Sequence, residues 1–209
     1  VGHYKSEVTA LDESLKPVSV YGGEVKTMVG QPVSVFWGYK TDGVISSAAE
    51  ANALGLYKKE GTNIYKFGAG DVKFVDVNPG ENPGLIDEND KTVIGDPNPD
   101  FYGNIYSSMK YKNWNLDIVC NYSVGNDIYN FYRQQLESGS SFNNQSTALV
   151  NRWVIDGQKT STPKVAFGDP MGNSRFFDRW IEDGSYLRLK TVKLSYSVPV
   201  SYSWLQGLV

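Results

Sequence analysis

Apolar and polar side chains alternate through the middle of the chain. Every second residue of the range 114–122 is large or apolar: Trp114, Leu116, Ile118, Cys120 and Tyr122. Mostly polar residues stand between them, and the range 101–111 alternates in the same way. A period of two is the signature of a strand with one buried face, so we predict two antiparallel strands joined by a tight turn at Lys112-Asn113.

The alternation is compatible with two environments. Strands of about ten residues with aromatic ends fit a transmembrane hairpin, whose ends lie in the aromatic girdles and whose middle meets hydrocarbon. A hairpin on a soluble β-sandwich shows the same period, with Asp117 then facing solvent. The pattern alone leaves both interpretations open.

A long strand is also predicted over residues 186–198, and its apolar face changes parity. Leu187 and Leu189 share one parity, whereas Val192 and Leu194 have the other. A β-bulge near Thr191 or a change of environment would account for this switch.

One segment favours a short helix. Residues 46–56 are rich in Ala, Glu and Leu, and Ser46 or Ser47 is a suitable N-cap. Gly55 is placed to end the helix. The range 131–180, in contrast, shows no sustained period and is predicted to be a long loop.

Composition narrows the function classes. The 209 residues carry a net charge of −3, which gives no electrostatic support for nucleic acid as a partner. The single cysteine rules out an internal disulfide, and the single histidine argues against a histidine-based metal or catalytic centre. No apolar run reaches the length of about 18 residues that a transmembrane helix needs.

An acidic segment covers residues 71–100. Its oxygen-bearing side chains are Asp76, Asn78, Glu81, Asp87 and Asp90. Several oxygens on one flexible loop are what Ca²⁺ requires, although the spacing departs from that of an EF-hand. A solvated acidic surface loop is the alternative interpretation.

Several motifs together resemble one known family. They are VGQPVSVFWGYKTDGVI at 29–45, VIGDPNPDFYGN at 93–104, GNDIYN at 125–130 and WIEDGSYLRLK at 180–190. These stretches are similar to signatures of the SusC/RagA family of TonB-dependent outer-membrane transporters. The acidic segment also resembles the family's aspartate-rich loop, but it carries an insertion of about three residues in the middle.

The resemblance implies an all-β fold: part of an antiparallel transmembrane β-barrel of the 22-strand class, with long extracellular loops and one short helix. Residues 1–209 would form a partial barrel domain, with 71–100 as a calcium-loop-like extracellular insertion and 131–180 as a long loop. The family's N-terminal plug has no counterpart that we recognise in this chain, and contact with TonB would go through that missing part.

The function implied by the resemblance is import of glycans or peptides across the outer membrane of a Bacteroidota-type bacterium. A SusD-like surface lipoprotein would be the lid partner, and outer-membrane lipid would surround the barrel. Such a protein is not an enzyme and requires no cofactor, with Ca²⁺ in the acidic loop as the one candidate ion.

Candidate substrate-binding residues lie in and beside the long loop. They are Arg152, Trp153, Arg175, Phe176, Arg179 and Trp180. Aromatic rings stack on sugar faces, and arginines hydrogen-bond to hydroxyls or acidic groups. The structural alternative is that the aromatic residues pack the loop or belong to the membrane-interface girdle.

Two rival functions come from other classes. One is a secreted, soluble, β-rich carbohydrate-binding module in which the acidic loop binds Ca²⁺. The other is a structural surface protein that assembles through its strand edges.

Overall fold

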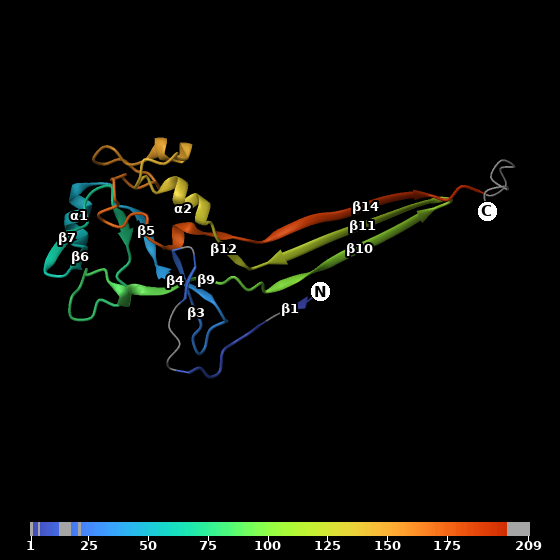
Figure 1. Ribbon diagram of the computed structural model, residues 1–209, viewed down its shortest axis with the longest axis horizontal. Coiled ribbons are helices and arrows are strands. Elements are labelled where there is room, and N and C mark those ends of the chain that lie inside the picture. Colours follow the sequence, from blue (N-terminus) through green and yellow to red (C-terminus); the bar gives the residue numbers. More distant parts are fainter. Residues whose placement is uncertain (1, 4, 13–17, 21, 200–209) are drawn as a thin grey trace. The chain divides into compact units, whose positions relative to one another are not determined.

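The computed structural model describes residues 2–3, 5–12, 18–20 and 22–199. The chain divides into two compact units, each described separately (Figure 1). The long-strand unit comprises Val1–Lys5, Asn98–Asn126 and Gly184–Val209, and the mixed unit comprises Ser6–Pro97 and Asp127–Asp183. No helix in the described part of the chain is long and apolar enough to cross a membrane.

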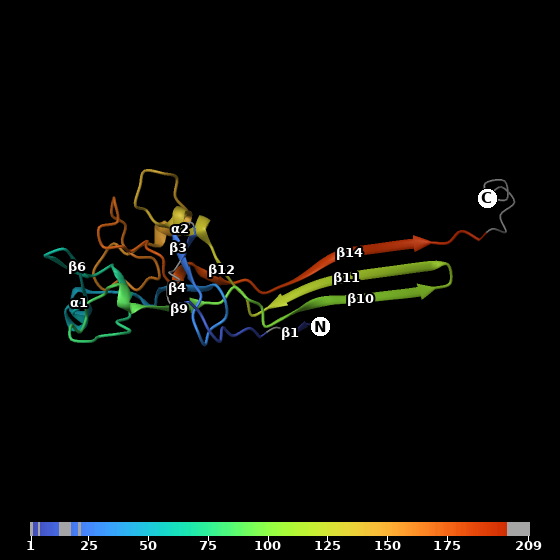
Figure 2. The same ribbon diagram turned by 60° about the horizontal axis from the view of Figure 1, so that its bottom comes forward.

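The long-strand unit is an antiparallel sheet with the strand order β1-β10-β11-β14. Strands β10 (Phe101–Tyr111), β11 (Trp114–Val124) and β14 (Tyr186–Tyr196) have 11 residues each and lie side by side (Figure 2). The two-residue strand β1 (Gly2–His3) pairs with the start of β10. The predicted hairpin and its turn are confirmed, and Lys112 takes a positive φ of 53° in that turn.

One face of this sheet is apolar across all of the long strands. Ile118 of β11 is paired with Ser107 of β10 and with Val192 of β14, and Leu116 is paired with Met109 and Leu194. Leu194 is 63% exposed and Val192 is 56% exposed. The chain therefore leaves a continuous apolar face uncovered, which in a water-soluble unit would be unfavourable.

A β-bulge aligns the two halves of β14. Val119 pairs with Thr191, but the next residue, Cys120, pairs with Leu189, so Lys190 is the extra residue. The bulge predicted near Thr191 is confirmed. Because it restores the alternation, Leu187 and Leu189 join the same apolar face as Val192.

The opposite face of the sheet is polar. Asp117 accepts hydrogen bonds from the Ser108 hydroxyl at 2.6 Å, the Tyr106 hydroxyl at 3.1 Å and the Asn115 amide at 2.9 Å. This side-chain network spans β10 and β11, and it is suited to a wet surface rather than to hydrocarbon.

The mixed unit contains several small sheets. Its largest has the order β2-β3-β4-β9, and three further strand pairs complete the unit. The strands are β2 (Val18–Val20), β3 (Gly23–Lys26), β4 (Val35–Tyr39), β5 (Thr41–Val44), β6 (Tyr57–Glu60), β7 (Asn63–Lys66), β8 (Val72–Phe74), β9 (Lys91–Gly95), β12 (Asp127–Tyr129) and β13 (Ile181–Asp183). Strand β5 pairs with β8, β6 with β7 and β12 with β13.

The predicted helix forms as α1 (Ala48–Leu54). The Ser47 side chain accepts from the backbone N–H of Glu50, and Gly55 ends the helix in the left-handed conformation. The prediction of only one helix is wrong, because α2 (Phe131–Glu137) opens the range predicted as a long loop. Short 3-10 turns also occur: η1 (Glu88–Asp90), η2 (Thr147–Asn151) and η3 (Asp178–Trp180).

Aromatic residues form the core of the mixed unit. Phe177 contacts Phe74 and Trp180 with ring centroids 5.7 Å and 5.4 Å apart, and Phe177 and Trp180 are each 1% exposed. The C-terminal part of the range 131–180 is therefore anchored in the core by buried rings.

A buried carboxylate joins the start of β8 to the same range. Asp71, 1% exposed, accepts from the Asn173 amide at 2.8 Å and forms an ion pair with Lys164 at 3.0 Å. The Asn173 carbonyl oxygen accepts from the backbone N–H of Val72 at 2.9 Å. These contacts supply hydrogen bonds that a buried ion requires.

Candidate functional site: two adjoining cavities

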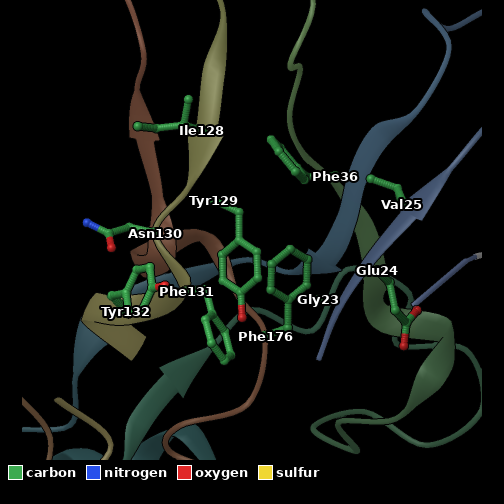
Figure 3. A pocket seen from close by; sticks show the side chains of 10 residues that line it. All are labelled: Gly23, Glu24, Val25, Phe36, Ile128, Tyr129, Asn130, Phe131, Tyr132 and Phe176. Carbon is green, nitrogen blue, oxygen red and sulfur yellow. The ribbon is translucent and has the colours of Figure 1, made fainter. Parts of the chain in front are cut away.

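An aromatic cavity of about 580 Å³ opens in the mixed unit. Strands β3 and β4 form one side, and the end of β12 with the start of α2 forms the other (Figure 3). Its lining residues are Gly23, Glu24, Val25, Phe36, Ile128, Tyr129, Asn130, Phe131, Tyr132 and Phe176. We call it the aromatic cavity. Figure 3 shows the rings of Tyr129 and Phe176 next to each other at its centre.

Glycines on two neighbouring strands make room for the Phe176 ring. A Cβ atom on Gly23 would lie 2.8 Å from this ring, and one on Gly38 would lie 3.0 Å from it. The ring packs edge-to-face against Tyr129 with centroids 4.8 Å apart. Glycine inside a strand often marks such a close approach, and here it holds Phe176 in one position.

Polar groups in the wall of this cavity are engaged within the protein. The Tyr129 hydroxyl donates to Gln134, and burial raises the pKa of Tyr129. The Asn130 amide donates to Glu182 at 3.1 Å, while its carbonyl oxygen accepts from the backbone N–H of Arg133 at 3.0 Å. The wall therefore presents mainly aromatic and aliphatic surface.

A second cavity of about 360 Å³ adjoins the first, and we call it the polar cavity. Its lining residues are Gly22, Glu24, Trp37, Tyr39, Glu88, Lys91, Gln134, Arg175 and Phe176. Glu24 and Phe176 line both cavities.

The cations of the polar cavity differ in their partners. Lys91 forms ion pairs with Glu24 at 2.7 Å and Glu88 at 2.6 Å. Burial by itself would lower the pKa of Lys91, but the hydrogen bonds to both carboxylates outweigh it and the pKa is raised. Arg175, in contrast, forms no ion pair with any residue that the structure describes.

The position of Arg175 is set by other contacts. Its Nε donates to the carbonyl oxygen of Gly172 at 3.0 Å, and an Nη donates to that of Met171 at 2.9 Å. The guanidinium also lies over the rings of Tyr39 and Phe74, 5.0 Å and 4.8 Å from their centroids. With Nε and one Nη engaged in this way, the remaining N–H groups of the guanidinium are the donors that can bind an anionic group.

The six predicted substrate-binding residues are thus separated by the fold. Arg175 and Phe176 line the cavities, whereas Trp180 is buried in the core and its indole N–H donates to the Arg175 carbonyl oxygen at 2.9 Å. The other predicted residues, Arg152, Trp153 and Arg179, do not line either cavity.

Those three side chains make contacts elsewhere in the mixed unit. Trp153 donates its indole N–H to the carbonyl oxygen of Ser46 at 2.9 Å. Arg179 forms an ion pair with Glu137 at 2.7 Å. Arg152 donates to the carbonyl oxygen of Leu149 at 3.1 Å.

Most of the residues that line the two cavities were not predicted from the sequence. Phe36, Tyr129 and Lys91 come from separate elements, and no local spacing connects them. The available signal was Gly23 and Gly38 inside apolar strand patterns, which indicates close packing but does not identify the partner ring.

The acidic residues predicted to bind a metal fall into separate groups. Asp90, 1% exposed, accepts from the backbone N–H groups of Val77 at 3.0 Å and Asp87 at 2.8 Å. Asp76 accepts from the Gly84 N–H at 2.7 Å through one oxygen, while its buried Oδ1 has no hydrogen-bond partner among the described residues.

Burial and the neighbouring Asp76 carboxyl raise the pKa of Asp90. The other candidates, Asn78, Glu81 and Asp87, line a separate small cavity of about 140 Å³. Asp87 caps η1 by accepting from the Asn89 N–H at 2.7 Å. Within the described ranges, no three His, Cys, Asp or Glu side chains gather as metal ligands do.

In sequence, the chain is similar to segments of TonB-dependent receptors. It is 30% identical to TonB-dependent receptor P3 of Formosa agariphila over 181 residues, 86% of this chain and 16% of that receptor. It is 28% identical to TonB-dependent receptor P26 of the same organism over 186 residues, 89% of this chain and 18% of that receptor. The chain therefore spans less than a fifth of these curated relatives. No protein-family model matches it.

Solved structures give a consistent result for the fold. The RagAB peptide transporter matches with a TM-score of 0.66 at 22% identity, over 94% of this chain and 20% of that chain. The closed-closed state of the RagAB peptide importer matches with a TM-score of 0.61 at 23% identity, over 93% of this chain and 20% of that chain. The predicted fold class, part of a large antiparallel β-barrel, is confirmed.

Proposed function

Because the chain is homologous to a segment of TonB-dependent receptors and has the fold of a segment of RagAB, we propose that it belongs to a SusC/RagA-type importer in the outer membrane. The substrate is a glycan or a peptide, transport is driven through TonB, and a SusD-like surface lipoprotein covers the barrel. The protein makes and breaks no covalent bond in this role. The relatives' source favours a Bacteroidota-type bacterium.

The long-strand unit carries this proposal. Its 11-residue strands present an uncovered apolar face on one side and the Asp117 network on the other. A barrel wall between lipid and an aqueous lumen needs this division, because each strand exposes alternate residues to each environment. A soluble calcium-binding module, in contrast, would leave the same apolar face in water at a cost.

The two cavities support the import role. They lie in the mixed unit, which is built from the segments between β1 and β10 and between β11 and β14. Binding residues are commonly carried on such connecting segments, while a rigid scaffold positions them.

Uptake by cells tests the proposal. The full-length protein is expressed in an outer membrane with its neighbouring lipoprotein, and accumulation of labelled oligopeptides and oligosaccharides is followed with and without TonB. We expect accumulation of one ligand class that stops when TonB is absent, and co-purification of the lipoprotein. Recovery of the protein in the water-soluble fraction, or uptake that does not depend on TonB, would overturn the proposal.

A further inference from the structure

The two adjoining cavities differ in character, so together they suit a ligand that carries an apolar group next to a negative charge. We propose that they bind the carboxy-terminal residue of a short peptide, with its apolar side chain in the aromatic cavity and its carboxylate at Arg175. This inference rests on the proposed import function and narrows its substrate class.

The wall of the aromatic cavity selects an apolar group. Phe36, Tyr129 and Phe176 present ring surface, and the Tyr129 hydroxyl and the Asn130 amide are bonded within the protein. A sugar ring needs hydrogen-bond partners for its hydroxyls, and burying hydroxyls without them is unfavourable. An aromatic or branched aliphatic side chain has no such requirement and gains from leaving water.

The polar cavity holds one cation, Arg175, that no carboxylate of a described residue pairs with and that can receive a negative charge. Lys91 is already paired with Glu24 and Glu88, so its charge is neutralised within the protein. Arg175 is held by backbone carbonyl oxygens and by two rings, but no carboxylate of a described residue pairs with it. Its remaining N–H groups can donate charge-assisted hydrogen bonds to a carboxylate.

The two subsites adjoin in the fold. Arg175 and Phe176 are consecutive, and Phe176 lines both cavities. In a peptide's last residue, the side chain and the carboxylate leave the same carbon atom. An internal residue lacks the carboxylate, an acidic side chain lacks the apolar group, and an acidic sugar carries additional hydroxyls. A carboxy-terminal apolar residue meets all of these requirements.

Calorimetry on the purified full-length protein tests the inference without any variant. The ligands are glycyl-glycyl-phenylalanine, its carboxy-terminal amide, glycyl-glycyl-serine and a uronic-acid trisaccharide. We expect the free acid with phenylalanine to bind tightest. Hydrogen bonds to charged groups contribute enough for the amide to bind roughly tenfold to a hundredfold more weakly. The serine peptide should lose affinity by a similar factor, because its side chain leaves the aromatic cavity unfilled.

Variants then test whether Arg175 is the residue that binds the carboxylate. Arg175→Ala should lower affinity for the free acid to that for the amide, and leave the amide unchanged. Arg175→Lys, which keeps the charge, should retain part of the preference. Lys66→Ala removes an exposed cation of β7, outside both cavities, and should keep the full preference.

Other results would overturn the inference. Equal affinity for acid and amide in the unaltered protein would exclude a carboxylate subsite, and so would Arg175→Ala weakening both ligands equally. Preference for the uronic-acid trisaccharide would reject the peptide class. In these cases TonB-dependent uptake can persist, so the proposed import function would stand. Loss of TonB dependence would instead reject that function.

Discussion

Paired lysine substitutions in β14 test the assignment of the two faces of the long-strand sheet. Val192 lies on the apolar face, is 56% exposed and pairs with Ile118. Its neighbour Thr191 points to the opposite face and pairs with Val119. Val192→Lys and Thr191→Lys therefore place the same charge one residue apart, on opposite sides of the sheet.

The expected loss of stability follows from the length of the strand and from the depth of residue 192 in the membrane. An 11-residue strand extends about 36 Å at roughly 3.3 Å per residue, and a tilt of about 45° leaves about 25 Å along the membrane normal. This matches the apolar band of an outer-membrane barrel, and residue 192 lies near its middle. Lysine on the lipid face at this depth costs about 2–4 kcal/mol, whereas in the lumen it costs far less.

Urea titration of the full-length protein in lipid vesicles measures the difference, with the heat-dependent gel shift of folded barrels as the readout. We expect Val192→Lys to lower the unfolding free energy by about 2–4 kcal/mol. Thr191→Lys should change the unfolding free energy by less than about 1 kcal/mol. Equal effects, or a larger effect at Thr191, would refute the assignment of lipid and lumen faces.

Three further predictions concern the mixed unit. Asp71→Ala leaves the buried Asn173 amide and the part-exposed Lys164 without this partner, so we expect a loss of about 1–3 kcal/mol in unfolding free energy, measured by denaturant titration. Gly38→Ala should displace the Phe176 ring and weaken peptide binding about tenfold in calorimetry, because a Cβ there lies 3.0 Å from that ring. The sequence predicts Ca²⁺ binding by the acidic segment, and Asp76→Asn should abolish any such binding that calorimetry detects. It should also reduce, without abolishing, the pH dependence of stability, because burial and then Asp76 raise the pKa of Asp90, and the folded loop gains stability as pH falls through that pKa.

Controls separate these effects from general damage. Asp42→Asn removes an exposed carboxylate outside the acidic segment and should leave Ca²⁺ binding unchanged. An unchanged unfolding free energy in Asp71→Ala would show that the Asp71 carboxylate does not stabilise the packing of β8 against the range 131–180. Unchanged peptide affinity in Gly38→Ala, or Ca²⁺ binding that survives Asp76→Asn, would contradict the corresponding prediction.

Local patterns predicted several elements because local forces determine them. Alternation over residues 114–122 predicted β11, and the parity change near Thr191 predicted the bulge. Ser47 and Gly55 bounded α1 because capping depends on neighbouring backbone groups. Helix α2 was missed because its sequence is short and polar, with no apolar period to reveal it.

The candidate site was only partly accessible from sequence. Arg175 and Phe176 were predicted from their residue types, and both line the cavities. Trp180 has the same chemistry as an exposed stacking residue, yet it is 1% exposed and belongs to the core. Residue type indicates what a side chain can bind, whereas burial decides whether a ligand can reach it.

The sequence by itself determined the strand alternation of β10 and β11, the turn between them, the β-bulge in β14 and the two caps of α1. It also determined the resemblance to a known family. Each of these features depends on residues close in the chain. Tertiary structure alone decided that Phe176 lies against Gly23 and Gly38, and that Lys91 is paired while Arg175 is not. Those outcomes depend on which distant segments pack together. Shape complementarity and charge neutralisation between such segments have no signature in local spacing.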